Sequence, residues 1–244
     1  MDVITQTITW LTNPANWTGP NGIDIRLAEH IAIAAVSMVI AIGIAMPAGF
    51  YIGHTGRGAT YAINLANLGR ALPSLAVIAI VLPITAAFDP QAGFKVYPTL
   101  IAMVLLAIPP ILVNSYAGVA GVDRDLVEAA RGMGLHEWQI LSRVEIPIAL
   151  PVILGGVRSA AVQVVATATL GAIFGFGGLG RFIVEGIAQN DDGMLFGGVV
   201  LVALLAIVTE VLVSILQRAF TSPGLKRTVQ SSREPEAAAQ PARA

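Results

Sequence analysis

Long stretches without charge constrain the fold of this chain more than any other feature of its sequence. The segment from Ile31 to Tyr51 contains no Asp, Glu, Lys or Arg. A helix rises about 1.5 Å per residue, so roughly 20 apolar residues are enough to cross the hydrocarbon core of a membrane. Segments of this kind predict an all-α integral membrane protein.

Five stretches are long and apolar enough to be transmembrane helices. They cover residues 31–51, 61–88, 96–119, 146–174 and 194–220. The second stretch carries Arg70 near its start and contains Pro73 and Pro83. Its first half either crosses the membrane or follows the cytoplasmic interface before Pro73 redirects it. We expect about five transmembrane helices.

The spans define a transmembrane domain over residues 29–220. An outer segment, 1–28, precedes it, and residues 221–244 follow it. This last segment is rich in Ser, Pro, Ala, Gln and charge, and such a composition cannot bury a core. It is expected to be a disordered cytoplasmic tail.

The composition supports a membrane protein and excludes several kinds of site. Charged residues make up 12% of the chain, against about 25% in soluble domains. The chain has no cysteine, which excludes disulfides, thiolate metal sites and a cysteine nucleophile. It contains no HExxH motif and no paired carboxylates within the spans. We therefore expect no catalytic residue, no metal site and no nucleic-acid partner.

The positions of lysine and arginine predict the orientation, because these residues accumulate in cytoplasmic segments. With the N-terminus outside, the outer segments hold Arg26, Lys95 and Arg181. The inner segments then hold Arg57, Arg124, Arg131, Arg143, Arg218, Lys226, Arg227, Arg233 and Arg243. Nine inner charges against three outer ones favour a cytoplasmic C-terminus.

Residues 120–145 form a cytoplasmic loop between the third and fourth spans, far longer than a simple turn. One face of a short helix is predicted by apolar residues at positions i, i+3, i+4 and i+7, namely Leu126, Ala129, Ala130 and Met133. Asp123 or Asp125 can cap its start, and Gly132 and Gly134 end it. A second short helix follows, and Pro147 is placed where the fourth span would begin, a position that proline tolerates.

This loop resembles the EAA loop of the permease subunits of ATP-binding-cassette (ABC) importers. That signature is Glu-Ala-Ala, three residues, Gly, nine residues, Ile-x-Leu-Pro. It matches here at Glu128, Ala129, Ala130, Gly134 and Pro147, with Val144 and Ile146 in place of the usual Ile and Leu. The resemblance implies a coupling helix that docks into a groove of a cytoplasmic ATPase. The alternative is an ordinary amphipathic helix lying on the membrane.

The resemblance extends over roughly residues 25–220. The run from Asn67 to Pro83 and the glycine-rich run from Gly171 to Gly180 are similar to the permeases for methionine and for osmoprotectants. The N-terminal part, which includes Trp17 and residues 26–30 and 53–57, most resembles the osmoprotectant branch, whose solutes are glycine betaine, choline, carnitine and proline betaine.

The resemblance implies a methionine-importer-like permease core and a set of partners. These are a pair of cytoplasmic ABC ATPases that bind ATP and Mg, an extracytoplasmic substrate-binding protein, and a second permease copy or paralogue. The permease itself would hydrolyse nothing and bind no cofactor. Methionine or another amino acid is the alternative cargo. The alternative of a different class is a secondary transporter or channel. Such proteins typically contain inverted repeats or carboxylates in the middle of the membrane, and neither is evident in this sequence.

Two charges lie deep in the predicted spans, Arg158 in the fourth and Glu210 in the fifth. Such residues are costly in a membrane and are usually paired or functional. Their expected depths differ by only a few ångströms, so an ion pair between the two spans is plausible, and a role in transport is the alternative.

Two polar stripes are candidates for a wetted pathway or for hydrogen bonding between helices. The first consists of Asn64, Asn67, Arg70 and Ser74, and the second of Ser159, Gln163 and Thr167. Pairs of small residues, Gly155 with Ser159 and Gly156 with Ala160, predict close helix packing.

A glycine-rich turn on the outer side contains Gly175, Gly177, Gly178 and Gly180. Glycines there would let the backbone form a re-entrant or gate-lining turn, which is tolerated only where protein or water covers it. The three histidines, His30, His54 and His136, lie near the interfaces and are expected to be bystanders.

Overall fold

The computed structural model describes residues 2–220, except the side chains of Leu65, Leu68 and Arg70. Within this range every regular element is a helix, which confirms the all-α fold class. The predicted tail at 221–244 lies outside the described residues. At the N-terminus, α1 (Val3–Thr12) and a short 3-10 turn (Pro14–Asn16) precede the first long helix.

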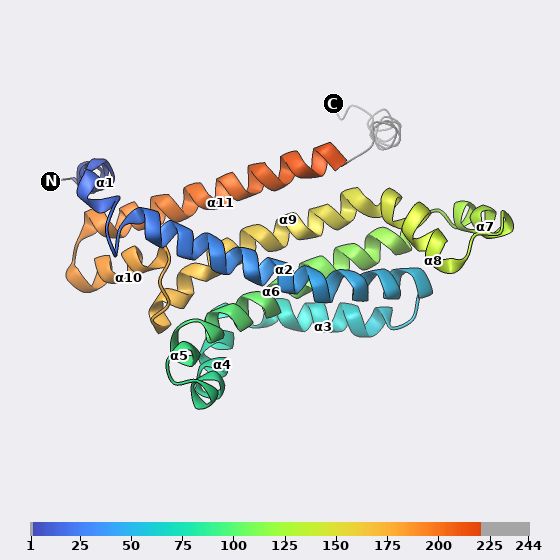
Figure 1. Ribbon diagram of the computed structural model, residues 1–244, viewed down its shortest axis with the longest axis horizontal. Helices are drawn as coiled ribbons and strands as arrows, with labels where there is room; N and C mark the ends of the chain where they lie inside the picture. Colours follow the sequence, from blue (N-terminus) through green and yellow to red (C-terminus); the bar gives the residue numbers. More distant parts are fainter. Residues whose placement is uncertain (1, 221–244) are drawn as a thin grey trace, which may run out of the picture.

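The centre of the molecule is a bundle of three long helices. These are α2 (Ile23–Thr55), α6 (Tyr97–Ala120) and α9 (Ile146–Gly171). Helix α6 packs along both α2 and α9, so that the three lie side by side (Figure 1). The core between them is built largely from small and branched side chains, among them Ala41, Ala107, Ile111, Ala160 and Val164.

Close approach of these helices depends on residues without a bulky side chain. A Cβ on Gly156 of α9 would lie 2.5 Å from Cβ of Asn114 and 2.7 Å from the carbonyl oxygen of Pro110, both in α6. Ala160, one turn further along α9, is fully buried. This confirms the predicted close packing at Gly156 and Ala160. Gly155 has only the Gln217 amide nearby, at 3.8 Å, so the neighbouring pair does not share that role.

The second predicted span is divided into two helices. Helix α3 (Ala59–Ala71) and α4 (Ser74–Phe88) are separated at Leu72 and Pro73, both of which have extended backbone. Proline disfavours helical backbone in the residue before it, which is consistent with the extended Leu72, although Pro47 and Pro83 are accommodated inside helices. Both helices pack against α6. The short α5 (Ala92–Lys95) then leads into α6.

The helix that contains the fourth predicted span begins earlier than expected. Helix α8 (Glu137–Ile140) continues through a π-helical turn, Leu141–Glu145, into α9 and ends in a 3-10 turn, Ala172–Phe174. Pro147 stands in the first turn of α9. It has no N–H to donate to the preceding turn, and the irregular π turn occurs directly before it.

After the glycine-rich turn, α10 (Gly180–Gln189) and α11 (Asp192–Phe220) complete the described chain. Helix α11 contacts α1, α9 and α10 and exposes much of its apolar surface. Four helical segments are long and apolar enough to cross a membrane: 23–55, 97–120, 137–174 and 192–220. The remaining predicted span, residues 61–88, corresponds to α3 and the shorter apolar α4 together. The count of five transmembrane helices therefore stays a prediction.

Candidate functional site

The loop between α6 and α9 folds as the sequence predicts. Helix α7 (Arg124–Gly132) begins with Asp123, whose Oδ1 accepts a hydrogen bond from the Asp125 N–H at 2.9 Å. It ends just before Gly134, whose φ of +85° lies in the left-handed region that favours glycine. The N–H groups of Met133 and Leu135 then bond back to the carbonyls of Ala129 and Ala130. This reversal brings α8 back toward the bundle.

Helix α7 has a buried face and an exposed apolar stripe. Val127 and Ala130 are buried against the bundle. Of the four residues of the predicted face, Leu126 is 50% exposed and Met133 75% exposed, and Ala129 is exposed beside them. The predicted apolar face therefore does not pack inward, except at Ala130. Glu128 is exposed on the same helix.

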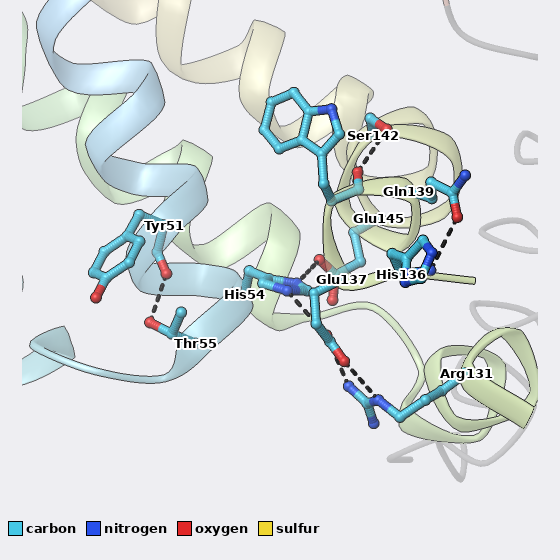
Figure 2. Close-up of polar contacts among 10 residues, drawn as sticks. Tyr51, His54, Thr55, Arg131, His136, Glu137, Gln139, Ser142 and Glu145 are labelled. Atoms are coloured by element: carbon cyan, nitrogen blue, oxygen red, sulfur yellow. Dashed lines mark hydrogen bonds and ion pairs between the residues drawn. The ribbon is translucent and has the colours of Figure 1, made fainter. Parts of the chain in front are cut away.

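A chain of polar contacts joins this loop to the C-terminal end of α2 (Figure 2). His54, in the last turn of α2, places Nδ1 2.6 Å from Glu145 Oε2 and Nε2 3.2 Å from Glu137 Oε2. Glu137 in turn accepts two hydrogen bonds from the Arg131 guanidinium, at 2.8 and 3.0 Å. These bonds raise the pKa of Arg131. We call these four residues, Arg131, Glu137, His54 and Glu145, the clasp.

The clasp corrects the expectation that the histidines are bystanders. The side chain of His54 is 13% exposed and that of Glu145 only 3%, so the pair is largely shielded from solvent. The two residues are 91 positions apart in sequence, and no spacing rule connects them. The sequence signal that could have suggested this contact is that both residues lie next to predicted span ends on the same side of the membrane. His136 is exposed, as its position suggested.

On the opposite side of the bundle, the glycine-rich turn is fastened to α2. Glu29 Oε2 accepts a hydrogen bond from the Gly178 N–H at 2.8 Å. The fully buried His30 accepts one from the Leu179 N–H at 3.2 Å through Nδ1, and its Nε2 lies 3.0 Å from the Val165 carbonyl. His30 therefore holds the turn against both α2 and α9, and it is not a bystander either.

Glycine is favoured at the predicted positions of this turn for different structural reasons. Gly175 and Gly178 have φ values of +87° and +72°. A Cβ on Gly177 would collide with the Glu29 carboxylate, and one on Gly180 with the Thr169 carbonyl. Three of the four positions are thus restricted, Gly175 and Gly178 by conformation and Gly180 by the backbone of Thr169, whereas a side chain at Gly177 would have to displace the Glu29 carboxylate.

A cavity of about 570 Å³ opens beside this turn. Its walls are mostly apolar and include Phe176, but three charged side chains also line it, Arg26, Glu29 and Lys95. Arg26 contacts Glu29 at 3.0 Å. Lys95 makes no ion pair with the other side chains that the structure describes. The cavity therefore offers both signs of charge and an aromatic ring to a small polar molecule.

The two predicted intramembrane charges meet. Arg158 Nε lies 3.3 Å from Glu210 Oε1, which joins α9 to α11. About two helical turns away, the Gln217 amide donates to the Pro151 carbonyl at 2.8 Å and joins the same helices. The expected pairing is confirmed, although both side chains remain about 40% exposed in the single chain.

The members of each polar stripe differ in their exposure. Asn64 and Asn67 of α3 are exposed, and Ser74 is half-buried beyond the break at Pro73. The side chain of Arg70 lies outside the described part of the chain. Along α9, Ser159 is exposed, Gln163 half-buried and Thr167 buried. Their assignment to a pathway stays a prediction.

The chain matches the protein family described as "binding-protein-dependent transport system inner membrane component" over residues 41–222. It is 34% identical to a carnitine transport permease of Listeria monocytogenes, over 83% of this chain and 89% of the relative. It is 33% identical to a glycine betaine/carnitine/choline transport permease of Bacillus subtilis, over 82% and 89%. An osmoprotectant import permease of Salmonella typhimurium is 35% identical, over 81% and 91%.

Solved structures share the fold. A methionine ABC transporter in an inward-facing conformation matches with a TM-score of 0.69 at 22% identity, over 82% of this chain and 96% of that one. An amino acid ABC transporter matches with a TM-score of 0.64 at 17% identity, over 91% and 98%. At these identities the likeness supports the fold and says nothing about the solute.

Proposed function

Because the chain belongs to the family of inner-membrane components of binding-protein-dependent transport systems, we propose that it forms the translocation pathway of an ABC importer for compatible solutes. The solutes are glycine betaine, carnitine, choline or proline betaine. The chain acts with a second permease copy or paralogue, a pair of cytoplasmic ABC ATPases and an external binding protein. ATP and Mg bind to the ATPases, and this chain binds neither.

The exposed apolar stripe of α7 is the observation that carries this proposal. Leu126 and Met133 project from a loop outside the membrane-length helices, where nothing in the described chain covers them. Apolar side chains exposed together on a polar loop are typical of an interaction site. The EAA-loop residues Glu128, Ala129, Ala130 and Gly134 lie in the same helix and its terminal turn, so we assign this surface to the ATPase.

The solute class rests on the relatives and on the outer cavity. Relatives at 33–35% identity are named for carnitine, for osmoprotectants, or for glycine betaine, carnitine and choline, and these three solutes share a quaternary ammonium group. Aromatic faces and carboxylates attract such cations, and Phe176 and Glu29 both line the cavity. Lys95 supplies the opposite charge for a solute that also bears a carboxylate.

The docking surface is tested by Leu126→Asp and Met133→Asp. A buried, unpaired carboxylate at an interface is costly, so each variant should lose most of the co-purifying ATPase and of solute uptake, while still inserting in the membrane. Thr60→Asp is the matched control, because it adds the same charge at an exposed site in the first turn of α3. Full ATPase binding and uptake in both stripe variants would contradict the assignment.

The cargo is tested by uptake into proteoliposomes that contain the permease, its ATPase and its binding protein. Radiolabelled glycine betaine, carnitine, choline and methionine are compared with and without internal ATP. The proposal expects ATP-dependent uptake of at least one quaternary ammonium solute and none of methionine. Uptake of methionine alone would replace the solute class and leave the permease function in place.

A further inference from the structure

The four clasp residues alternate in charge and join the loop at residues 120–145, here called the coupling loop, to helix α2. The contacts start at α7 and run in the order Arg131, Glu137, His54 and Glu145. Glu145 belongs to the π turn, the irregular segment that joins α8 to α9, and π turns frequently occur at functional positions. Among the described residues, His54 is the only hydrogen-bond or ion-pair partner of the Glu145 carboxylate. Three segments of the loop are thus tied to α2 through one imidazole ring.

The two contacts of His54 are satisfied together when the ring is an imidazolium. Each ring nitrogen faces a carboxylate oxygen, and carboxylates only accept hydrogen bonds. Both nitrogens can donate at once only in the imidazolium form. In that form the four clasp residues carry two positive and two negative charges, so a nearly buried carboxylate is neutralised where it would otherwise be costly.

Apolar packing also joins the loop to the bundle, but it does not define an orientation. Phe50 and Met46 of α2 lie against the apolar cluster that contains Val127, Ile140 and Leu141. Hydrophobic contacts are non-directional and tolerate small rotations, whereas charge-assisted hydrogen bonds depend on angle and distance. The clasp therefore supplies the directional link between loop and helix.

We propose that His54 is a positioning residue that holds the coupling loop to the inner end of α2, so that a displacement of α7 by the ATPase moves this helix with it. The proposal rests on the proposed function and assigns to it a route by which motion enters the bundle. Glu145 is the partner through which His54 acts.

The first test measures solute uptake per ATP hydrolysed in the complete reconstituted transporter. His54→Gln and Glu145→Gln should each lower this ratio about tenfold, which is the effect of losing a charged hydrogen bond, while the ATPase still co-purifies. The double variant removes both charges and should recover much of the ratio. Arg143→Gln is the control, because it removes an exposed charge from the same π turn.

A purely structural role would lower protein yield and thermal stability and leave the ratio of uptake to hydrolysis unchanged in the protein that remains. That outcome would overturn the proposal. So would single variants with normal coupling, or a double variant that is no better than either single one.

The second test does not depend on the stability of those variants. The chain has no cysteine, so His54→Cys with Glu137→Cys can be joined by a short bifunctional thiol reagent. Cross-linking should restore coupling to this double variant, because it replaces the polar link with a covalent one. Cross-linked transporter that remains uncoupled would contradict the proposal. If the wild-type chain does not bind the ATPase, the result would instead contradict the proposed function itself.

Discussion

Arg158 and Glu210 show how two charges can be accommodated in apolar helices. Their contact at 3.3 Å joins α9 to α11, and both lie within membrane-length segments. A charge that loses its partner in such surroundings is strongly destabilising. In the structure the pair joins two helices, and a role of either residue in transport stays a prediction.

Arg158→Ala and Glu210→Ala are each expected to lower the melting temperature of the purified protein, because each leaves the other charge unpaired. The double variant should recover part of the loss. A coupling free energy of about 0.5–3 kcal/mol is expected for groups in contact. Ser159→Ala, an exposed neighbour, is the control. Additive effects of the two substitutions would show that the ion pair does not form.

At the scale of the elements, the spacing between α6 and α9 is set by individual small residues. Gly156 faces Asn114 and the backbone of Pro110, whereas Gly155 faces open space except for the Gln217 amide. Two adjacent glycines of one helix thus differ completely in what a side chain would meet. Small residues at helix interfaces allow close approach in membrane proteins in general.

Gly156→Val should therefore destabilise the fold, and Gly155→Val should not. Overpacking of a close contact costs typically about 1–3 kcal/mol, enough to lower the melting temperature and the yield of membrane-inserted protein. The two variants carry the same substitution at neighbouring positions and control each other. Equal stability of both would mean that α6 and α9 do not approach at Gly156.

The coupling loop and the glycine-rich turn illustrate how far element boundaries follow from sequence. The cap at Asp123, the end of α7 and the break before Pro73 were all expected from residue type, because each depends on backbone conformation within a few residues. The second short helix was expected as well, but the π turn that makes α8 continuous with α9 was not, because a continuous helix and a loop satisfy the same local preferences. The exposure of Leu126 and Met133 was also not evident, since helical periodicity does not say which face is covered.

At the scale of the whole molecule, the long helices leave two distinct ends. The C-terminal end of α2 and helices α7 and α8 lie at one end, and α1, α5 and α10 lie toward the other (Figure 1). Among the described residues, Arg57, Arg124, Arg131 and Arg143 lie just after α2 or in the loop at the end that carries α7, against Arg26, Lys95 and Arg181 toward the other end. We propose on that basis that this end is cytoplasmic and that the N-terminus is outside.

Single cysteines test this orientation in a chain that has none of its own. Thr55→Cys and Met133→Cys should be protected from a membrane-impermeant thiol reagent in intact cells, and Gln91→Cys and Gln189→Cys should react. All four positions are exposed, so differences in labelling report the side of the membrane. Labelling of Met133→Cys from outside would reverse the orientation and remove the assignment of α7 to a cytoplasmic ATPase.

The sequence by itself determined the class of fold, most helix positions and the position of the loop between α6 and α9, and it predicted a similar depth for Arg158 and Glu210. These features depend on the transfer of apolar residues to lipid and on local backbone preferences, both of which are encoded residue by residue. Only the tertiary structure decided that His54 meets Glu145 and Glu137, that Glu29 and His30 hold the glycine-rich turn, and that Gly156 rather than Gly155 is enclosed. Such contacts depend on how each helix is rotated and tilted against its neighbours, and that is fixed by the packing of the whole bundle.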